Sequence, residues 1–145
     1  MKVYFAGSIR GGRQDAALYG RFIDHMKKRC TVLTEHVGAA HISLMGEETR
    51  SETEIHDRDM EWLNACDAMV AEVTQPSLGV GYEIGRAVEA GKGVLCLFRQ
   101  GEGRSLSAMI AGCGSVQVAF YSSPSEAERV MDAFLDTARA AGEAP

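Results

Sequence analysis

The chain has 145 residues, 46% of them hydrophobic and 24% charged, and its 15 Lys and Arg against 20 Asp and Glu give a formal net charge of −5. This length suits one globular domain around one core. The acidic balance argues against a general nucleic-acid binder, which needs a surplus of basic side chains, but it is compatible with a small anion in a locally basic or amide-rich pocket.

Short apolar runs alternate with helical patterns along the whole chain. In chain order, the sequence predicts a strand over 3–6, a helix over 15–28, a strand over 32–33, a helix from 51 through 63, a strand over 68–73, a helix over 81–90, a strand over 94–98, a short helix over 104–111, a strand over 116–120 and a helix from 124 to about 141.

Two kinds of signal support the predicted helices. Leu18, Phe22 and Met26 recur every four residues and would share one helical face. Ser51-Glu52-Thr53-Glu54 and Ser123-Pro124-Ser125-Glu126 both have the Ser-x-x-Glu form of a capping box, and the second adds Pro at the first helical position. Both segments therefore predict helix starts.

This alternation predicts an α/β fold: one Rossmann-like, flavodoxin-like domain over 1–145, with a five-stranded, mostly parallel sheet and helices on both faces. The apolar run 68–71 fits a strand that is buried on both sides. Ligands of such folds bind at the carboxyl ends of strands, near a switch in strand order. The loops after the first three strands are therefore the candidate site.

No apolar stretch approaches the roughly 18 residues that span a bilayer, and the first residues turn polar at Ser8, so we expect a cytoplasmic chain without a signal peptide. The four cysteines, Cys30, Cys66, Cys96 and Cys113, contain no Cys-x-x-Cys pair, which argues against a zinc knuckle or thioredoxin motif. Cys66 and Cys96 are expected to be buried thiols.

The loop after the first strand, Gly7-Ser8-Ile9-Arg10-Gly11-Gly12-Arg13, is rich in groups that bind anions. Its glycines let backbone N–H groups approach a substrate, and Ser8, Arg10 and Arg13 add donors. The loop lacks the Lys and Ser/Thr of a Walker A motif and does not match Gly-x-Gly-x-x-Gly. A plain strand-to-helix turn is the alternative interpretation.

The loop after the third strand carries Gly79, Gly81 and Gly85 in a Gly-x-Gly-x-x-x-Gly pattern, one residue longer than the dinucleotide fingerprint, which argues against NAD. It places Ser77 and free amides at a helix N-terminus, where a phosphate can bind. Glu83 is expected in the first helical turn. A purely structural interpretation of Glu83 is a favourable interaction with the helix dipole, worth ~0.3–1 kcal/mol. However, a carboxylate beside a bound phosphate suggests a role in catalysis.

A second acidic segment, 54–62, contains Asp59. Its neighbours Asp57, Arg58 and Glu61 are expected to form a solvated face. Two carboxylates beside an anion site suggest glycosyl chemistry, because one can attack the anomeric carbon while the other orients the sugar or supplies a proton. His36 follows the second strand and could contact a ligand. His41 and His56 do not complete a metal-ligand spacing with it, so no metal or cofactor is expected.

Three segments together, Tyr4–Gly12, Leu33–Val37 and Ala71–Glu83, resemble the 2′-deoxynucleoside 5′-monophosphate N-glycosidases, the Rcl-type branch of the nucleoside 2-deoxyribosyltransferase superfamily. Residues 95–99 and 106–110 extend the match, which covers the first strand through the fourth helix. The resemblance implies a hydrolase that releases a free base and 2-deoxyribose 5-phosphate through a covalent glycosyl-enzyme.

The resemblance also implies residue roles. Glu83 would attack C1′, Asp59 would position the sugar and assist departure of the base, and Tyr4 would lie beside the sugar and the nucleophile. The phosphate would be bound by Ser8, Arg10, Ser77 and Gly79. The glycines of the first loop, Gly7, Gly11 and Gly12, would also contact the substrate. The base and sugar would be bound by Ile9, His36 and Ile55. A homodimer is implied, in which Ser107, with Met109 close by, completes the neighbouring site.

Three other functions stay open: a deoxyribosyltransferase that passes the sugar between bases, a ribonucleotide N-glycosidase, and a non-catalytic nucleotide sensor. A phosphate seat argues against the transferase, because nucleosides carry no phosphate to fill it. An uncompensated Glu83 beside a phosphate would weaken binding, which argues against the sensor. No nucleic-acid polymer or membrane is expected as a partner.

Overall fold

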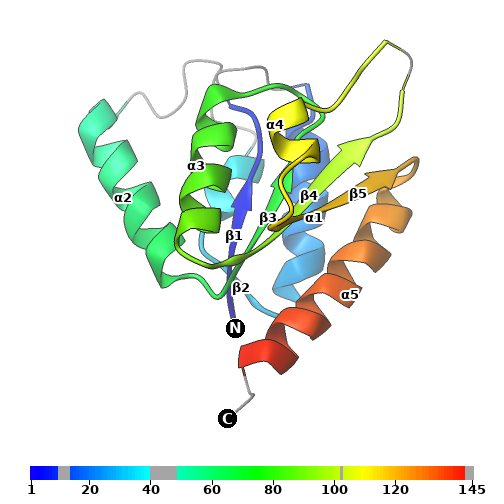
Figure 1. The fold of residues 1–145 in the computed structure, drawn as a ribbon. Helices are drawn as coiled ribbons and strands as arrows, with labels where there is room; N and C mark the ends of the chain where they lie inside the picture. Colours follow the sequence, from blue (N-terminus) through cyan, green and yellow to red (C-terminus); the bar gives the residue numbers. More distant parts are fainter. Residues whose placement is uncertain (10–13, 40–48, 102, 143–145) are drawn as a thin grey trace.

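The structure, a computed structural model, describes residues 1–9, 14–39, 49–101 and 103–142 (Figure 1). Its elements are β1 (Lys2–Ala6), α1 (Ala16–Lys27), β2 (Thr31–Val32), the 3-10 helix η1 (Glu35–Gly38), α2 (Glu52–Ala65), β3 (Ala68–Glu72), α3 (Leu78–Glu89), β4 (Gly93–Arg99), α4 (Ala108–Ala111), β5 (Val116–Tyr121) and α5 (Pro124–Gly142). Of the residues singled out in the sequence, Arg10, Gly11, Gly12, Arg13 and His41 lie outside the described residues.

All strand pairs of the five-stranded sheet are parallel, in the order β2-β1-β3-β4-β5. This order confirms the α/β prediction and is that of flavodoxin-like folds. The strand order reverses between β1 and β3, so the loops that leave these two strands diverge at their carboxyl ends and open a crevice there. Within the described ranges, no helix has the length and apolar character needed to cross a bilayer.

Two apolar cores lie on opposite faces of the sheet, as alternation along each strand requires. On β1, Val3 and Phe5 join the core that packs against α1 and α5, whereas Tyr4 and Ala6 join the core that packs against α2 and α3 (Figure 1). The predicted buried thiols Cys66 and Cys96 are confirmed in the second core. The register of β1 therefore places Tyr4 under the two helices that carry the candidate carboxylates.

Local capping sets the helix starts. The Ser51 hydroxyl accepts from the Glu54 N–H and the Glu54 side chain accepts from the Ser51 N–H, which confirms the first capping box. The Ser77 hydroxyl accepts from the Val80 N–H, so α3 begins at Leu78 and not at residue 81 as predicted. The predicted helix over 104–111 is shorter, because α4 starts only after its cap at Ser107.

Candidate active site

A tyrosine and a glutamate that are 79 positions apart in the sequence meet beneath α3. The Tyr4 hydroxyl donates a hydrogen bond to Glu83 Oε1 at 2.7 Å. Tyr4 is only 2% exposed, and Glu83 is part-buried. The expectation that Glu83 lies in the first turn of its helix is wrong, because α3 begins five residues earlier. The helix dipole acts mainly within the first turn, so it gives no account of a carboxylate at this depth.

Burial governs the protonation of this pair. Burial raises the pKa of Glu83 to about 7; the hydrogen bond from Tyr4 opposes this shift, and the nearby charge of Asp59 adds to it. Burial and the charges of Glu83 and Asp59 raise the pKa of Tyr4 well above its usual range. Tyr4 therefore stays a neutral donor at every ordinary pH, while Glu83 exchanges its proton near neutrality, as expected of a catalytic carboxyl group.

The raised pKa of Glu83 has a cost in stability. Between its ordinary value of 4.5 and about 7, the folded chain holds a proton that the unfolded chain has lost. The stability contributed by this group is therefore complete below about pH 4.5 and is lost as the pH rises through 7. We expect Glu83→Gln, which keeps an acceptor for Tyr4, to raise the free energy of unfolding by about 2–3 kcal/mol near pH 8 and much less near pH 5.

Urea unfolding of the variant and the parent chain at these two pH values measures the difference. Glu89→Gln is the matched control, because Glu89 lies on the same helix and is exposed. An equal gain at both pH values would show that ionisation of Glu83 is not its cause.

Asp59 reaches the same place from α2 and is held by its neighbour. Arg58 Nη2 and Nε donate to Asp59 Oδ1 at 2.8 and 3.0 Å, and the guanidinium lies 4.6 Å from the centroid of the Trp62 ring. Asp57 and Glu61 are exposed as expected, but the expectation that Arg58 is solvated is wrong, since its side chain is only 15% exposed. The i, i+4 spacing of Arg58 and Trp62 was the available signal for this contact.

An apolar cleft of about 990 Å³ opens beside these groups, at the upper end of the size usual for small-molecule sites. Its wall includes eight of the predicted site residues, namely Ile9, His36, Ile55, Asp59, Ser77, Gly79, Ser107 and Met109. Gly7, Ser8, Tyr4 and Glu83 are not in its wall. Glu83 adjoins the cleft through the lining residues Val80, Gly81 and Ile84 on its own helix.

The predicted phosphate seat is only partly described. Ser77 caps α3, and Ser77, Gly79 and Val80 at the start of this helix line the cleft. The Ser8 hydroxyl is fully buried, and within the described residues nothing hydrogen-bonds to it. Such a group ordinarily has a hydrogen-bond partner. Gly7 serves packing as well, because a Cβ there would lie 2.9 Å from the Tyr19 ring.

Comparison with known proteins finds a matching family and relatives that share one name. The family described as nucleoside 2-deoxyribosyltransferase matches residues 3–116. The 5-hydroxymethyl-dUMP N-hydrolase of Rattus norvegicus is 50% identical over 137 residues, covering 92% of this chain and 84% of that protein. The protein of the same name from Tetraodon nigroviridis is 61% identical over 113 residues, covering 77% of this chain and 80% of that protein.

Among solved structures, the CMP N-glycosidase BcmB of Clostridium botulinum aligns with a TM-score of 0.68 at 19% identity, covering 92% of this chain and 99% of that one. At this identity the likeness shows the fold alone.

Proposed function

The chain belongs to the nucleoside 2-deoxyribosyltransferase family, and from that premise we propose that it hydrolyses the N-glycosidic bond of 2′-deoxynucleoside 5′-monophosphates. The products are a free base and 2-deoxyribose 5-phosphate. The observation that carries this proposal is the Tyr4–Glu83 pair, a part-buried carboxyl group with a pKa of about 7 beside a cleft that also holds Asp59 and the capped start of α3. The relatives that are named as N-hydrolases of a deoxynucleoside 5′-phosphate support it.

The proposed reaction has two steps. The Glu83 carboxylate attacks C1′ and forms an ester, while the C1′–N bond breaks and its electron pair leaves with the base. The base takes up a proton from solvent, and Asp59 faces the sugar to stabilise its developing positive charge. Water then attacks C1′ and returns a proton to solvent, while the C1′–oxygen bond of the ester breaks and releases the Glu83 carboxylate. Tyr4 holds Oε1, so the attacking oxygen is Oε2.

An assay of free base tests the reaction class. The chain is incubated with the common deoxynucleoside monophosphates and with 5-hydroxymethyl-dUMP, beside the matching nucleosides, with and without an acceptor base, and beside ribonucleotides. We expect free base from deoxynucleotides. Exchange of bases between nucleosides would identify a transferase, base released chiefly from ribonucleotides would identify a ribonucleotide N-glycosidase, and nucleotide binding without release over a day would identify a sensor.

The proposed phosphate contacts predict a selective defect. We expect Ser8→Ala and Ser77→Ala each to lower kcat/KM for a deoxynucleotide by about 10-fold, the value of one charge-assisted hydrogen bond, and to leave the weak reaction of the matching nucleoside unchanged. Steady-state kinetics on both substrates measure the ratio, with the exposed Ser115→Ala as control. Equal losses on nucleotide and nucleoside would contradict a phosphate role for these hydroxyl groups.

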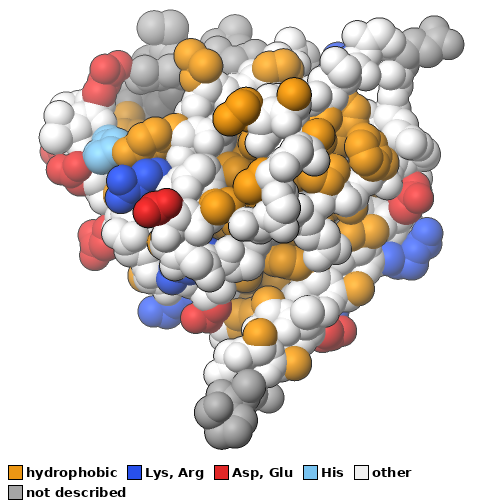
Figure 2. Space-filling view, viewed as in Figure 1, with side chains coloured by type: hydrophobic (Ala, Val, Ile, Leu, Met, Phe, Trp, Pro, Cys, Tyr) orange, Lys and Arg blue, Asp and Glu red, His pale blue; other side chains and the backbone are white. Residues whose placement is uncertain are grey.

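A homodimer and a cytoplasmic location are also part of the proposal. Large apolar side chains are exposed on α3, α4 and β5: Leu78 is 96% exposed and Met109 83%, with Phe120 and Tyr82 about half exposed. Figure 2 shows apolar side chains gathered on this face. A second copy on this face would cover them at the mouth of the cleft, where Ser107 lies. The four cysteines are free, as suits a reducing compartment.

A further inference from the structure

Arg58 contacts His36 and Asp59, which line the cleft with it, and also Trp62. Besides its two bonds to Asp59 Oδ1, its Nη2 lies 3.3 Å from His36 Nε2, and its guanidinium stacks on Trp62. His36 comes from η1, whereas the other three residues come from α2. An arginine held on several sides at 15% exposure has given up most of its hydration. Its neighbours, and not solvent, therefore determine where this charge lies.

We infer that Arg58 is a positioning residue, which fixes Asp59 and His36 in the orientation that the reaction requires. This inference rests on the proposed function, because it assigns Arg58 no chemistry of its own. Arg58 and His36 both line the cleft together with Asp59, so a change in Arg58 moves groups that face the substrate. The sequence predicts only a solvated side chain for Arg58, and the names of the relatives assign it no role.

The contact with His36 sets the tautomer of that ring. A guanidinium can only donate hydrogen bonds. His36 Nε2 must therefore accept from Arg58 Nη2, which leaves the ring proton on Nδ1. In this tautomer Nε2 is the acceptor and Nδ1–H is the donor.

The contact with Asp59 sets the direction and the electrostatics of that carboxylate. Both N–H groups donate to Oδ1, so neither bond uses Oδ2. The charge of Asp59 acts on Glu83 and on Tyr4. The positive charge of Arg58 beside Asp59 opposes the rise in the pKa of Tyr4.

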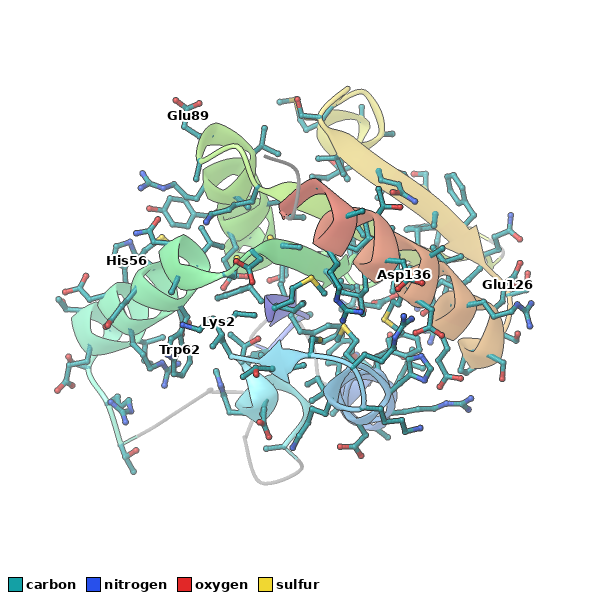
Figure 3. The ribbon with its side chains drawn as sticks, turned by 90° about the horizontal axis from the view of Figure 1, so that it is seen from below. Lys2, His56, Trp62, Glu89, Glu126 and Asp136 are labelled. Atoms are coloured by element: carbon teal, nitrogen blue, oxygen red, sulfur yellow. The ribbon has the colours of Figure 1, made fainter. Side chains whose placement is uncertain are left out.

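Trp62 gives the arginine its anchor. Its ring lies at cation–π distance from the guanidinium and 5.6 Å from the His36 ring. In Figure 3, His56 lies on the side of α2 toward α3, and Trp62 lies on the side away from α3. Trp62 is the only tryptophan of the chain, so its fluorescence reports on this cluster alone.

A double-mutant cycle tests the inference, since residues that act as one unit give non-additive losses. Arg58→Met, Asp59→Asn and the double variant are compared for kcat and KM on one deoxynucleotide. We expect Arg58→Met to lower kcat by about 30-fold with a much smaller change in KM, and to lower it by no more than about 3-fold in the Asp59→Asn background. Arg86→Met, an exposed arginine of α3, is the matched control and should act like the parent chain.

Two readouts separate positioning from folding. Arg58→Lys keeps the charge but not the planar fork, so it should fold even if Arg58→Met does not, should show the same kcat loss, and should change the Trp62 emission at unchanged melting temperature. Losses that multiply across the cycle, or a loss of activity that follows the melting temperature, would overturn the positioning role while the parent chain stays active. A parent chain that releases no base would overturn both this inference and the proposed function.

Discussion

Glu83→Gln is expected to abolish base release from deoxynucleoside monophosphates and to leave a folded chain. Turnover should fall by about 10⁴-fold or more, because the amide cannot form the glycosyl ester and no other described carboxylate pairs with Tyr4. The substitution keeps the size of the side chain and its acceptor oxygen. Free base measured at saturating substrate gives the result.

Glu89→Gln controls for a general effect of charge removal from α3, because Glu89 is the last residue of that helix and projects outward in Figure 3. Binding of the substrate to Glu83→Gln, measured by calorimetry, should persist, since the phosphate contacts are intact. A variant that keeps near-full turnover would place the nucleophile elsewhere.

Tyr4→Phe carries the second-largest expected effect. The Tyr4 hydroxyl bonds to Glu83 Oε1 at 2.7 Å, and this bond lowers the pKa of the carboxyl group against the effect of burial. Removing it leaves the carboxylate less stabilised and less well aimed. We expect a loss of about 10²–10³-fold in kcat/KM near pH 7, the usual cost of one buried donor at a reacting group.

The pH profile of the same variant gives a sharper test. Only ionised Glu83 attacks, so kcat/KM of the parent chain should fall tenfold for each pH unit below about 7. In Tyr4→Phe this limb should move to higher pH, so part of the loss is recovered under alkaline conditions. Tyr82→Phe, which removes a half-exposed phenol next to Glu83 in the sequence, is the control. A limb that stays in place would mean that Tyr4 does not act on Glu83.

The sequence was sufficient for features that depend on near neighbours. The helix over 15–28, the capping box at Ser51 and the apolar run of β3 depend on spacing within one turn or one strand, and all three are confirmed. The predicted start of α3 at residue 81 is wrong because the sequence leaves Leu78, Gly79 and Val80 in the preceding loop. The Ser77 cap draws these residues into the helix, and Gly79 has no positive φ that would exclude it.

In the site, too, contacts between residues far apart in the sequence could not be predicted from spacing. Nothing in the spacing of Tyr4 and Glu83 indicates that they touch, because β-sheet order decides which residues distant in the sequence meet; the resemblance to a family indicated it. The prediction of a solvated Arg58 follows from the usual exposure of charge runs on helices, and it is wrong here. Its burial depends on Trp62 and on His36, and the contact with His36 exists only once η1 packs near α2.

A trapped covalent intermediate tests the central claim most directly. The chain is incubated with a 2′-fluoro-substituted deoxynucleoside monophosphate, whose fluorine slows the second step because it destabilises positive charge at C1′. The denatured protein is then digested and weighed by mass spectrometry. We predict one sugar phosphate attached to Glu83 and none on the Glu83→Gln chain. Base released in stoichiometric amount with no adduct on Glu83, or an adduct on another side chain, would contradict Glu83 as the nucleophile.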